Sequence, residues 1–580
     1  MNERKRFCLN KITIAGILFA AFSVLTALIL FKLCGGIYYN NDDILMRSIA
    51  EGTFTGTPDG HLIFEMYVLG SFIAGLYKLF PQVNWYDLIA IGFHIASVSV
   101  MAVGIGLCSK GRLKQTVISV ISYMLIMGID ASMMVNSKFT VVSSVLFSAG
   151  IVCLAVWTRE KNALHAILSI FFVICSLLYR KEVFLMGIPI FVIVLLFMLL
   201  GSGVKENIKR VIIFLLSFVG IAVISIAVEI AAYSSDEWNY YKDFNESRAE
   251  LEDYVGVPVY EFSKDAYDNI SMTKADSIVL GRLDISFVDE YTLETSKDLV
   301  SASKVYVDAV NNERGISYLL SRIKKEFKNT WNQPIVIALF TVGFAGLLLS
   351  ILNRHWLSML STLALFAYQI LFSGYFLYKD RFPERVWYGL YFMLLTAFTL
   401  ILLREILSSA LKRKTKVYIC IPAVCLLAFF IKYCVGVQNY RINYYYKDLY
   451  EEHIEESADL YRYCYENSEN YYLLDSSVTM NLTDTMLSNG YKDTANQIPL
   501  SYWTNGSPLF EKKKENAGLE SLSEALISRD DVFLVQKESE NTDWIVNYYE
   551  SNGIEVSLSV EDSFSLGGGT ATVYRVLSEG

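Results

Sequence analysis

Two adjacent aspartates, Asp42 and Asp43, are the residues of this chain whose types and spacing most directly suggest chemistry. They follow the run Gly35–Asn41, just beyond a long apolar N-terminal segment. An ionised group close to hydrocarbon carries a solvation penalty, so a pair of carboxylates beside a membrane-spanning helix suggests a task at the membrane surface. Proton abstraction and metal binding are the two tasks for which carboxylates are suited.

The alternative is that the pair only begins a helix. Residues 42–50 fit a short helix lying flat on the membrane, with Asn41 or Asp42 as its cap. Its apolar face, toward lipid or protein, would be made by Ile44, Leu45 and Ile49. Capping and complementing the helix dipole are worth about 1 kcal/mol. One carboxylate is enough for that role and two are present, which favours a chemical task.

Composition places the acidic pair in a polytopic membrane protein. The chain has 580 residues, of which 53% are hydrophobic and only 19% are charged, and its mean hydropathy is +0.37. A soluble protein of this length is less apolar. Eleven apolar stretches are long enough to cross a bilayer as helices. They are residues 12–34, 86–108, 115–130, 139–157, 163–179, 183–201, 209–232, 334–352, 356–378, 386–403 and 416–436.

Positive charge decides how the segment from His61 to Phe80 is placed. The segment is apolar enough to span, yet it contains Glu65 and Lys78. If it does not cross, the basic connections that follow the second, fourth, sixth and tenth predicted spans all fall inside, as basic loops tend to. We therefore expect an interfacial or re-entrant segment on the outer side. The N-terminus is then cytoplasmic, and because no small-x-small cleavage site follows the first span, that span is an uncleaved anchor.

This topology predicts four parts. Residues 1–232 form a seven-span module with an outer first loop at 35–85, and residues 334–436 add four further spans. Residues 233–333 form an outer insertion between them. Residues 437–580 alternate helix-like and strand-like runs, which predicts a small extracytoplasmic α/β domain. Few prolines and isolated cysteines fit a bacterial plasma membrane.

Several function classes are disfavoured by composition. The nine cysteines include no CxxC pair, and only five histidines are scattered along the chain, so a zinc site built from Cys and His is not expected. The formal net charge of -9 argues against nucleic acid as a partner. No Walker-type phosphate loop is present in the sequence, so ATP is not an expected energy source.

Acidic and basic residues gather in the loops that this topology places outside. The first outer loop holds His61 and Glu65 in addition to the acidic pair. Later outer loops hold Asp130, Arg180, Lys181, Arg381 and Arg385. The interiors of the predicted spans are nearly bare of charge, so acids and bases meet on one face of the bilayer.

The layout resembles the GT-C superfamily of integral membrane glycosyltransferases, which take sugars from polyprenyl-phosphate carriers. The resemblance rests on a first span followed directly by Asp42-Asp43, a flat helix in the first outer loop, seven spans and a long outer loop. It covers residues 1 to about 333; the later spans and outer tail are of the accessory kind seen in many members. The segment Tyr378–Tyr388 looks like the basic, aromatic outer loops of uncharacterised bacterial relatives.

The resemblance implies transfer of a hexosyl or pentosyl group, with inversion, to a glycan, lipid or protein of the cell envelope. Either Asp42 or Asp43 would take the proton of the acceptor hydroxyl, worth about 10²- to 10⁴-fold in rate. Asp42 is slightly favoured. The leaving phosphate needs cations, and arginine suits it because its planar fork binds phosphate oxygens in pairs. The candidates are Arg381, Arg385, Arg180 and Lys181. No cofactor is required.

Further residues are candidates for contacts with the substrates. His61 and Glu65 lie in the first outer loop, and Trp238 and Arg248 lie among the aromatic and polar residues that open the insertion. Aromatic faces can stack on sugar rings, although an aromatic belt where the chain leaves the membrane explains Trp238 more simply. In the tail, Asp475, Asp484 and Trp503 are weaker candidates of the same kind.

The basic candidates have structural alternatives. Arg381 and Arg385 are four residues apart and close to Asp380 and Glu384, so surface ion pairs explain them equally well. The run 180–182 would likewise be the snorkelling end between two spans.

Asp130 leaves open whether the protein binds a divalent cation. Together with the first-loop acids this residue would hold a cation, as in family members that act on oligosaccharide donors. The alternative is that Asp130 only ends a short span.

A second functional class is also open. The chain could be a non-catalytic transporter, flippase or assembly protein for lipid-linked envelope glycans. A flippase should carry cationic residues deep within its spans, facing a central cavity. Here the charges gather at one face, which favours the enzyme.

Overall fold

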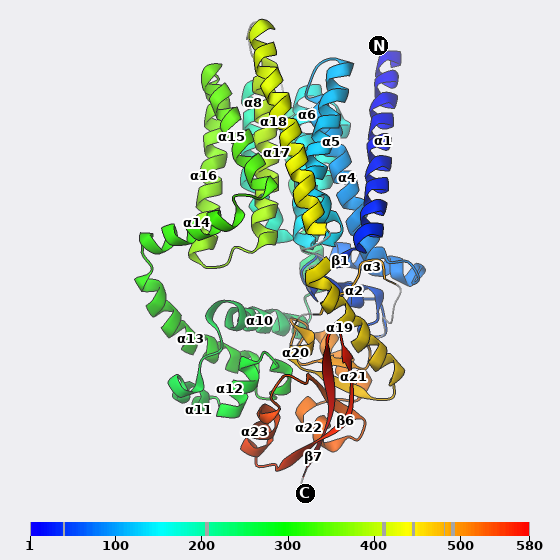
Figure 1. The fold of residues 1–580 in the computed structure, drawn as a ribbon, viewed down its shortest axis with the longest axis vertical. Coiled ribbons are helices and arrows are strands. Elements are labelled where there is room, and N and C mark those ends of the chain that lie inside the picture. Colours follow the sequence, from blue (N-terminus) through cyan, green and yellow to red (C-terminus); the bar gives the residue numbers. More distant parts are fainter. Residues whose placement is uncertain are drawn as a thin grey trace.

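The computed structural model describes residues 2–38, 41–202, 208–408, 413–442, 447–480, 482–488 and 494–578. A bundle of long helices forms one end of the molecule, and the polar regions of the chain form the other (Figure 1). The bundle contains α1 (Asn2–Cys34), α4 (Trp85–Leu107), α5 (Arg112–Met134), α6 (Phe139–Glu160), α7 (Ala163–Tyr179), α8 (Lys181–Ser202), α9 (Ile208–Ala232), α15 (Pro334–Leu352), α16 (Trp356–Tyr378), α17 (Glu384–Ser408) and α18 (Arg413–Tyr440).

The long helices confirm a polytopic helical membrane protein. In the described part of the chain, eight helices are long and apolar enough to cross a membrane. They are α4, α5, α6, α8, α9, α15, α16 and α17. Every one of the eleven predicted spans falls on a helix of the bundle, while the number of crossings stays a prediction. The central helix is α6, whose apolar window is entirely buried.

The first loop folds beneath the bundle. It contains α2 (Asn41–Glu51) and α3 (Tyr67–Leu79), and its strand β1 (Ile37–Tyr38) pairs in parallel with β2 (Asn136–Ser137) of the connection between α5 and α6. The 13 residues of α3 would extend about 20 Å as a helix, less than the hydrocarbon core of about 30 Å. This agrees with a segment that does not cross.

The insertion after α9 is helical. Its elements are α10 (Asp236–Glu250), η1 (Leu251–Val255), η2 (Tyr260–Phe262), α11 (Lys264–Asn269), α12 (Lys274–Gly281), η3 (Ile285–Phe287), α13 (Leu293–Glu313) and α14 (Ile316–Thr330). The last of them, α14, lies across the end of the bundle beside α16 (Figure 1).

The tail is a small α/β unit around a mixed five-stranded sheet. Its helices are α19 (Lys447–Glu466), α20 (Ser476–Thr479), α21 (Pro508–Ala517), α22 (Leu522–Ser528) and α23 (Asp543–Ser551). Its strands are β3 (Tyr471–Leu474), β4 (Gln497–Pro499), β5 (Val532–Lys537), β6 (Val556–Leu566) and β7 (Gly569–Ser578), in the spatial order β4-β3-β5-β7-β6. The strand-like runs of the sequence are therefore strands in the structure, and Gly567 and Gly568 form the β6–β7 hairpin turn.

The insertion, the tail and the first loop pack against one another. The backbone N–H of Ser286 donates to the carbonyl of Leu500, which joins the insertion to the tail at 3.1 Å. The ammonium of Lys513 in α21 donates to the carbonyl of Phe54 at 3.2 Å, which joins the tail to the first loop. Segments more than 200 residues apart thus form one surface at the end of the bundle.

The helix ends that precede the basic connections lie at the opposite end of the bundle. Successive helices alternate in direction, so the C-terminal ends of α4, α6, α8, α15 and α17 are remote from the insertion and the tail (Figure 1). Which end faces the cell interior stays a prediction.

Candidate functional site

Helix α2 holds the acidic pair in its first turn. Residues 43–50 are all buried, so the helix packs against protein and does not lie open to lipid. Two contacts fix it to the tail: Arg47 pairs with Asp484, and a guanidinium N–H of Arg47 donates to the Thr485 carbonyl at 3.4 Å. The two aspartates therefore lie on a helix that is fixed between the bundle and the tail.

The two carboxylates of the pair differ in access. The Asp42 side chain is 18% exposed, whereas Asp43 is 1% exposed. The Nη1 atom of Arg385 lies 4.0 Å from Oδ2 of Asp42. That distance is an electrostatic contact and is too long for a hydrogen bond. Of the pair, Asp42 is the one that a substrate in solvent can reach.

Tyr86 joins Asp43 to Glu65. Its hydroxyl oxygen lies 2.9 Å from Oδ1 of Asp43 and 3.2 Å from Oε1 of Glu65. A tyrosine hydroxyl has one proton and can donate to only one of the two. The other contact is a hydrogen bond only if that carboxyl donates its own proton to the tyrosine oxygen. If both contacts are hydrogen bonds, at least one of Asp43 and Glu65 is neutral.

The surroundings of these two acids favour the neutral form. Burial raises the pKa of Asp43 well above its ordinary value, and the Tyr86 hydrogen bond opposes the rise. Burial also raises the pKa of Glu65 well above its ordinary value, and the charge of Asp43 adds to the rise. The second oxygens, Oδ2 of Asp43 and Oε2 of Glu65, have no hydrogen-bond partner among the described residues. An ionised carboxylate is costly in such a place.

Nearby cations favour the ionised form of Asp42. Burial raises its pKa, and the guanidinium groups of Arg385, Arg180 and Arg248 oppose the rise. The indole N–H of Trp503 also lowers the pKa of Asp42, although it makes no hydrogen bond of ordinary geometry among the described residues. Among the site's acids Asp42 is the one that combines solvent access with nearby positive charge, which are the requirements of a general base.

Arg180 is fixed against two phenylalanines. Its guanidinium carbon lies 4.9 Å from the ring centre of Phe64 and 5.0 Å from that of Phe139. The two rings are parallel and 5.7 Å apart. The Nε atom of Arg180 pairs with Glu182 at 2.8 Å. The cation is thus oriented by packing before any ligand binds.

Trp503 brings the tail into the site. Its ring meets Phe64 edge-on at 5.0 Å, and its backbone carbonyl accepts a hydrogen bond from the hydroxyl of Tyr241 in α10. The site is therefore closed by three separate regions of the chain. Sequence reasoning gave Trp503 little weight and did not consider Tyr86 at all, because each lies in a segment that reads as an ordinary apolar or aromatic run.

His61 and Trp238 form an aromatic cluster beside the site. Their rings stack at 4.6 Å with an interplanar angle of 17°. Nδ1 of His61 lies 2.6 Å from the Asp59 carboxylate. Arg248 contacts the Asn245 amide oxygen at 2.8 Å and pairs with Glu252. These three predicted substrate contacts are engaged with neighbouring side chains, and Arg248 acts on Asp42 through its charge.

Two of the predicted phosphate ligands lie apart from the acidic pair. Arg381 pairs with Asp253 at 3.0 Å and lies 4.4 Å from the ring centre of Tyr254, on the insertion. The Lys181 side chain is 72% exposed and approaches Glu182 at 3.9 Å. Of the four predicted cations, the structure places Arg385 and Arg180 by the acids.

Asp130 lies inside α5, in a position one turn before the end of that helix. Its carboxylate accepts a hydrogen bond from Tyr388 at 2.7 Å and pairs with His94. It joins three helices and is fully buried. In the part of the chain that the structure describes, no group of three His, Cys, Asp or Glu residues is placed to hold a metal ion.

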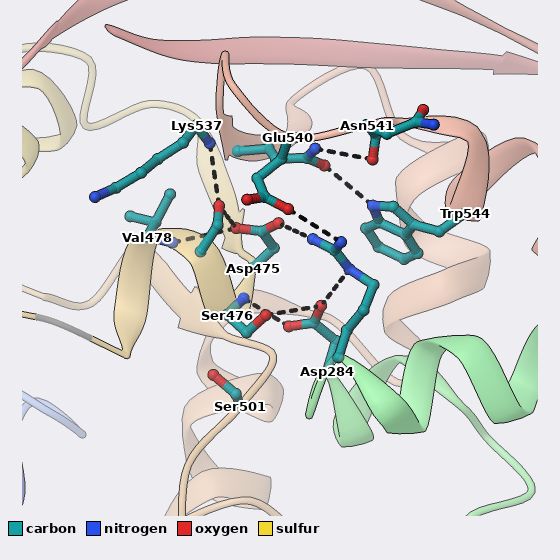
Figure 2. Close-up of polar contacts among 12 residues, drawn as sticks. Asp284, Asp475, Ser476, Val478, Ser501, Lys537, Glu540, Asn541 and Trp544 are labelled. Carbon is teal, nitrogen blue, oxygen red and sulfur yellow. Dashed lines mark hydrogen bonds and ion pairs between the residues drawn. The ribbon is translucent and has the colours of Figure 1, made fainter. Parts of the chain in front are cut away.

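A second polar cluster joins the insertion to the tail. Arg282 lies 2.8 Å from Asp475, 3.4 Å from Asp284 and 3.4 Å from Glu540, and its guanidinium carbon is 5.1 Å from the ring centre of Trp544. Figure 2 shows the carboxylates of Asp284, Asp475 and Glu540 converging on the centre of this cluster.

The two aspartates of this cluster are sealed from solvent. Asp284 and Asp475 are both 0% exposed. Oδ1 of Asp284 accepts from the Ser476 backbone N–H at 2.7 Å, and Oδ1 of Asp475 accepts from that of Val478 at 3.3 Å. Because both carboxylates accept hydrogen bonds from protein donors, we interpret the cluster as a structural contact that holds the insertion against the tail.

Comparison with known proteins gives no family for the chain. No protein-family model matches it, and no curated protein matches it. The class that the fold defines is a polytopic helical membrane protein with a small α/β tail.

Proposed function

We propose that the protein is a membrane glycosyltransferase of the GT-C kind, moving a sugar from a polyprenyl-phosphate donor to a cell-envelope acceptor on the outer face of the membrane. The observation that carries the proposal is the difference in accessibility and surroundings between the two aspartates of the acidic pair. Asp42 is reachable and is influenced by the charges of Arg385 and Arg180, whereas Asp43 is buried and contacts Tyr86, which also contacts Glu65.

The reaction is a single displacement at the anomeric carbon. The acceptor oxygen forms a bond to that carbon while the bond to the carrier phosphate breaks, which inverts the configuration. The acceptor hydroxyl loses its proton to the carboxylate of Asp42. Such positioned base catalysis contributes about 10²- to 10⁴-fold.

The two arginines stabilise the leaving group. Negative charge develops on the carrier phosphate as its bond to the sugar breaks, and guanidinium groups at fixed positions lower the energy of that state. Arg180 is oriented by Phe64 and Phe139. Within the described ranges, the one ion pair of Arg385 is its 4.0 Å contact with Asp42, so its N–H groups can turn toward phosphate oxygens.

The neutral acids have a supporting role. With Asp43 and Glu65 sharing at least one proton through Tyr86, the site avoids stacking three negative charges beside an anionic donor. Like charges so close together would repel the phosphate.

Reconstituted protein tests the proposal. Purified protein in lipid vesicles is supplied with a panel of polyprenyl-phosphate sugars and polyprenyl-diphosphate sugars together with envelope glycan acceptors, and release of the sugar from the carrier is measured. We expect one donor to be cleaved by the wild-type protein and not by Asp42→Asn. Movement of intact donor across the bilayer without cleavage would contradict the enzyme and favour a flippase.

A further inference from the structure

A groove of about 810 Å³ lies beside the candidate site, between α10, the segment after η3, and α21. Ligand pockets usually measure about 300–1,000 Å³, so the groove has the size of a binding site. No part of the proposed base and phosphate chemistry uses it.

One wall of the groove is aromatic. Tyr240 and Phe244 lie one turn apart on α10 and stack with ring centres 6.4 Å apart at 9°. Tyr291 meets Phe244 edge-on at 5.6 Å. Tyr240 is 44% exposed, and its hydroxyl accepts the backbone N–H of Leu293 at 3.1 Å. A flat ring face is therefore held in place, which suits stacking on the apolar face of a sugar.

The opposite wall offers an unused acceptor. The Asn505 side chain is buried, and its amide nitrogen donates to the Leu500 carbonyl at 2.8 Å and to Ser286 Oγ at 3.0 Å. Its amide oxygen has no hydrogen-bond partner among the described residues. The oxygen is itself buried, so a hydroxyl or amine of a ligand in the groove could donate to it only after a small displacement of the Asn505 side chain. Buried polar atoms are rarely left unpaired.

The charge of the groove selects the ligand. Its lining carries five carboxylates against two lysines; these charged residues are Asp236, Glu237, Asp289, Glu511, Glu515, Lys512 and Lys514. Lys514 is paired with Glu511 at 2.8 Å. An excess of negative charge repels anionic polymers and attracts amines.

The groove and the candidate site are connected by one segment of the tail. Trp503 contributes to the site, and Asn505 and Gly506 line the groove two and three residues later. Gly506 adopts φ +75°, and a Cβ there would lie 2.9 Å from the Phe244 ring. The close approach of this segment to α10 needs glycine for both reasons.

We propose that this groove binds the acceptor glycan, and that the glycan carries neutral or amino sugars and not acidic ones. This inference rests on the proposed function, since it names the acceptor class of the same reaction. Sugars remote from the reacting hydroxyl stack on Tyr240 and donate to Asn505, which holds the chain end toward Asp42.

Equilibrium binding tests the inference without turnover. The full-length Asp42→Asn protein in detergent micelles is titrated with three hexasaccharides, of glucosamine, N-acetylglucosamine and galacturonic acid. We expect the first two to bind and the galacturonic acid hexamer not to bind. Tyr240→Ala should weaken binding about tenfold, which corresponds to about 1.4 kcal/mol, and Tyr240→Phe should retain it. Tyr306→Ala is the matched control, because Tyr306 is also half-exposed on the insertion and its hydroxyl donates to one carbonyl.

Each outcome is decisive for one proposal. No binding of any hexamer, equal binding of the acidic one, or an unchanged affinity in Tyr240→Ala would overturn the groove assignment. Binding that depends on Tyr240 without any sugar transfer by the wild-type protein would leave the groove standing and refute the glycosyltransferase. Transfer that is unaffected by Tyr240→Ala would support the glycosyltransferase and overturn the groove assignment.

A separate observation concerns α14. Four large apolar side chains on it, together with Trp331 just after its end, are between 40% and 79% exposed. The four are Ile316, Leu320, Ile323 and Phe327, and with Trp331 their spacing of three and four residues forms one stripe. Lys324 and Lys328 lie beside the stripe, whereas Lys325 lies on the opposite side of the helix. This pattern is typical of helices that lie in a membrane interface.

The position of α14 agrees with that pattern. Asp380, just beyond the end of α16, pairs with Arg314 at 3.0 Å and with Arg322 at 2.5 Å and accepts a hydrogen bond from Tyr318. These contacts hold α14 across the end of the bundle (Figure 1). On the neighbouring bundle helix α16, Leu371 and Tyr375 are exposed as well.

We infer that α14 lies in the headgroup layer and contacts anionic lipid through Lys324 and Lys328, the two lysines beside the apolar stripe. The test incorporates a photoreactive benzoylphenylalanine at Leu320, or at Lys325 as the control on the polar side, in protein reconstituted into phosphatidylglycerol vesicles. After illumination, mass spectrometry should find lipid adducts at position 320 and few at 325. Cross-linking of position 320 to a second protein copy, or equal labelling at both positions, would overturn the inference.

Discussion

Replacement of Arg282 by glutamine should loosen the insertion from the tail. The guanidinium is the cation between Asp284 and Asp475, both fully buried (Figure 2). Removing one member of a buried ion pair typically costs about 3–5 kcal/mol, because the remaining charge is left uncompensated. The Arg282 side chain is 19% exposed, and water can enter in its place. We therefore expect about 3 kcal/mol.

The loss should depend on pH. Burial raises the pKa of Asp284 well above its ordinary value, and the charge of Asp475 adds to the rise. Burial also raises the pKa of Asp475. The folded state therefore binds protons at a pH where the unfolded state has released them, and its stability falls as pH rises through the folded pKa. Without Arg282 the uncompensated charges matter most at neutral pH and less in acid.

Thermal unfolding in detergent micelles measures this. For a body of 150–250 residues, 1 kcal/mol shifts the midpoint by about 2–4 °C, so Arg282→Gln should lower it by about 6–12 °C at pH 7.5 and by less at pH 5. Arg575→Gln is the matched control, because its partners Asp530 and Glu561 are exposed and such pairs are worth about 0–1 kcal/mol. Adding Asp284→Asn should restore part of the loss. A deficit no larger than that of the control, or one that grows in acid, would refute the reasoning.

Three further outcomes follow from the candidate site. Arg385→Gln should lower sugar transfer about 10²-fold, while Arg381→Gln, whose partner is Asp253, should stay within about threefold; equal losses would contradict the assignment of Arg385. Wild-type transfer should rise with pH through the pKa of Asp42, which burial raises above its ordinary value, because the base acts ionised; a fall over that range would contradict it. Trp503→Phe removes the indole N–H that lowers this pKa, so the rise should move to higher pH. An unmoved pH–rate profile would show that Trp503 does not act on Asp42.

The membrane architecture was readable from the sequence because each long helix carries its own signal. An apolar stretch of sufficient length forms a helix in a bilayer whatever its neighbours are. The ends of the helices were harder to predict, because a helix can continue past the last residue of its apolar stretch. The third predicted span ended at Asp130, but α5 continues to Met134, which places Asp130 inside the bundle with His94 and Tyr388.

The partners within the site were beyond the sequence. Asp42 meets Trp503, and Asp43 meets Tyr86, through folding of segments tens to hundreds of residues apart. Arg381 and Arg385 looked equivalent at a spacing of four. That rule holds only within one helix, and α17 begins at Glu384, so the two side chains go to different neighbours.

The most direct test of the central claim compares Asp42→Asn with Asp43→Asn in reconstituted protein, measured as the rate of sugar release from the carrier. Asp42→Asn should lose about 10²- to 10⁴-fold, the usual contribution of a general base. Asp43→Asn should lose at most about tenfold, because an asparagine oxygen can still accept the Tyr86 hydrogen bond. A larger loss in Asp43→Asn than in Asp42→Asn would contradict the account, since it would make the sealed acid the base.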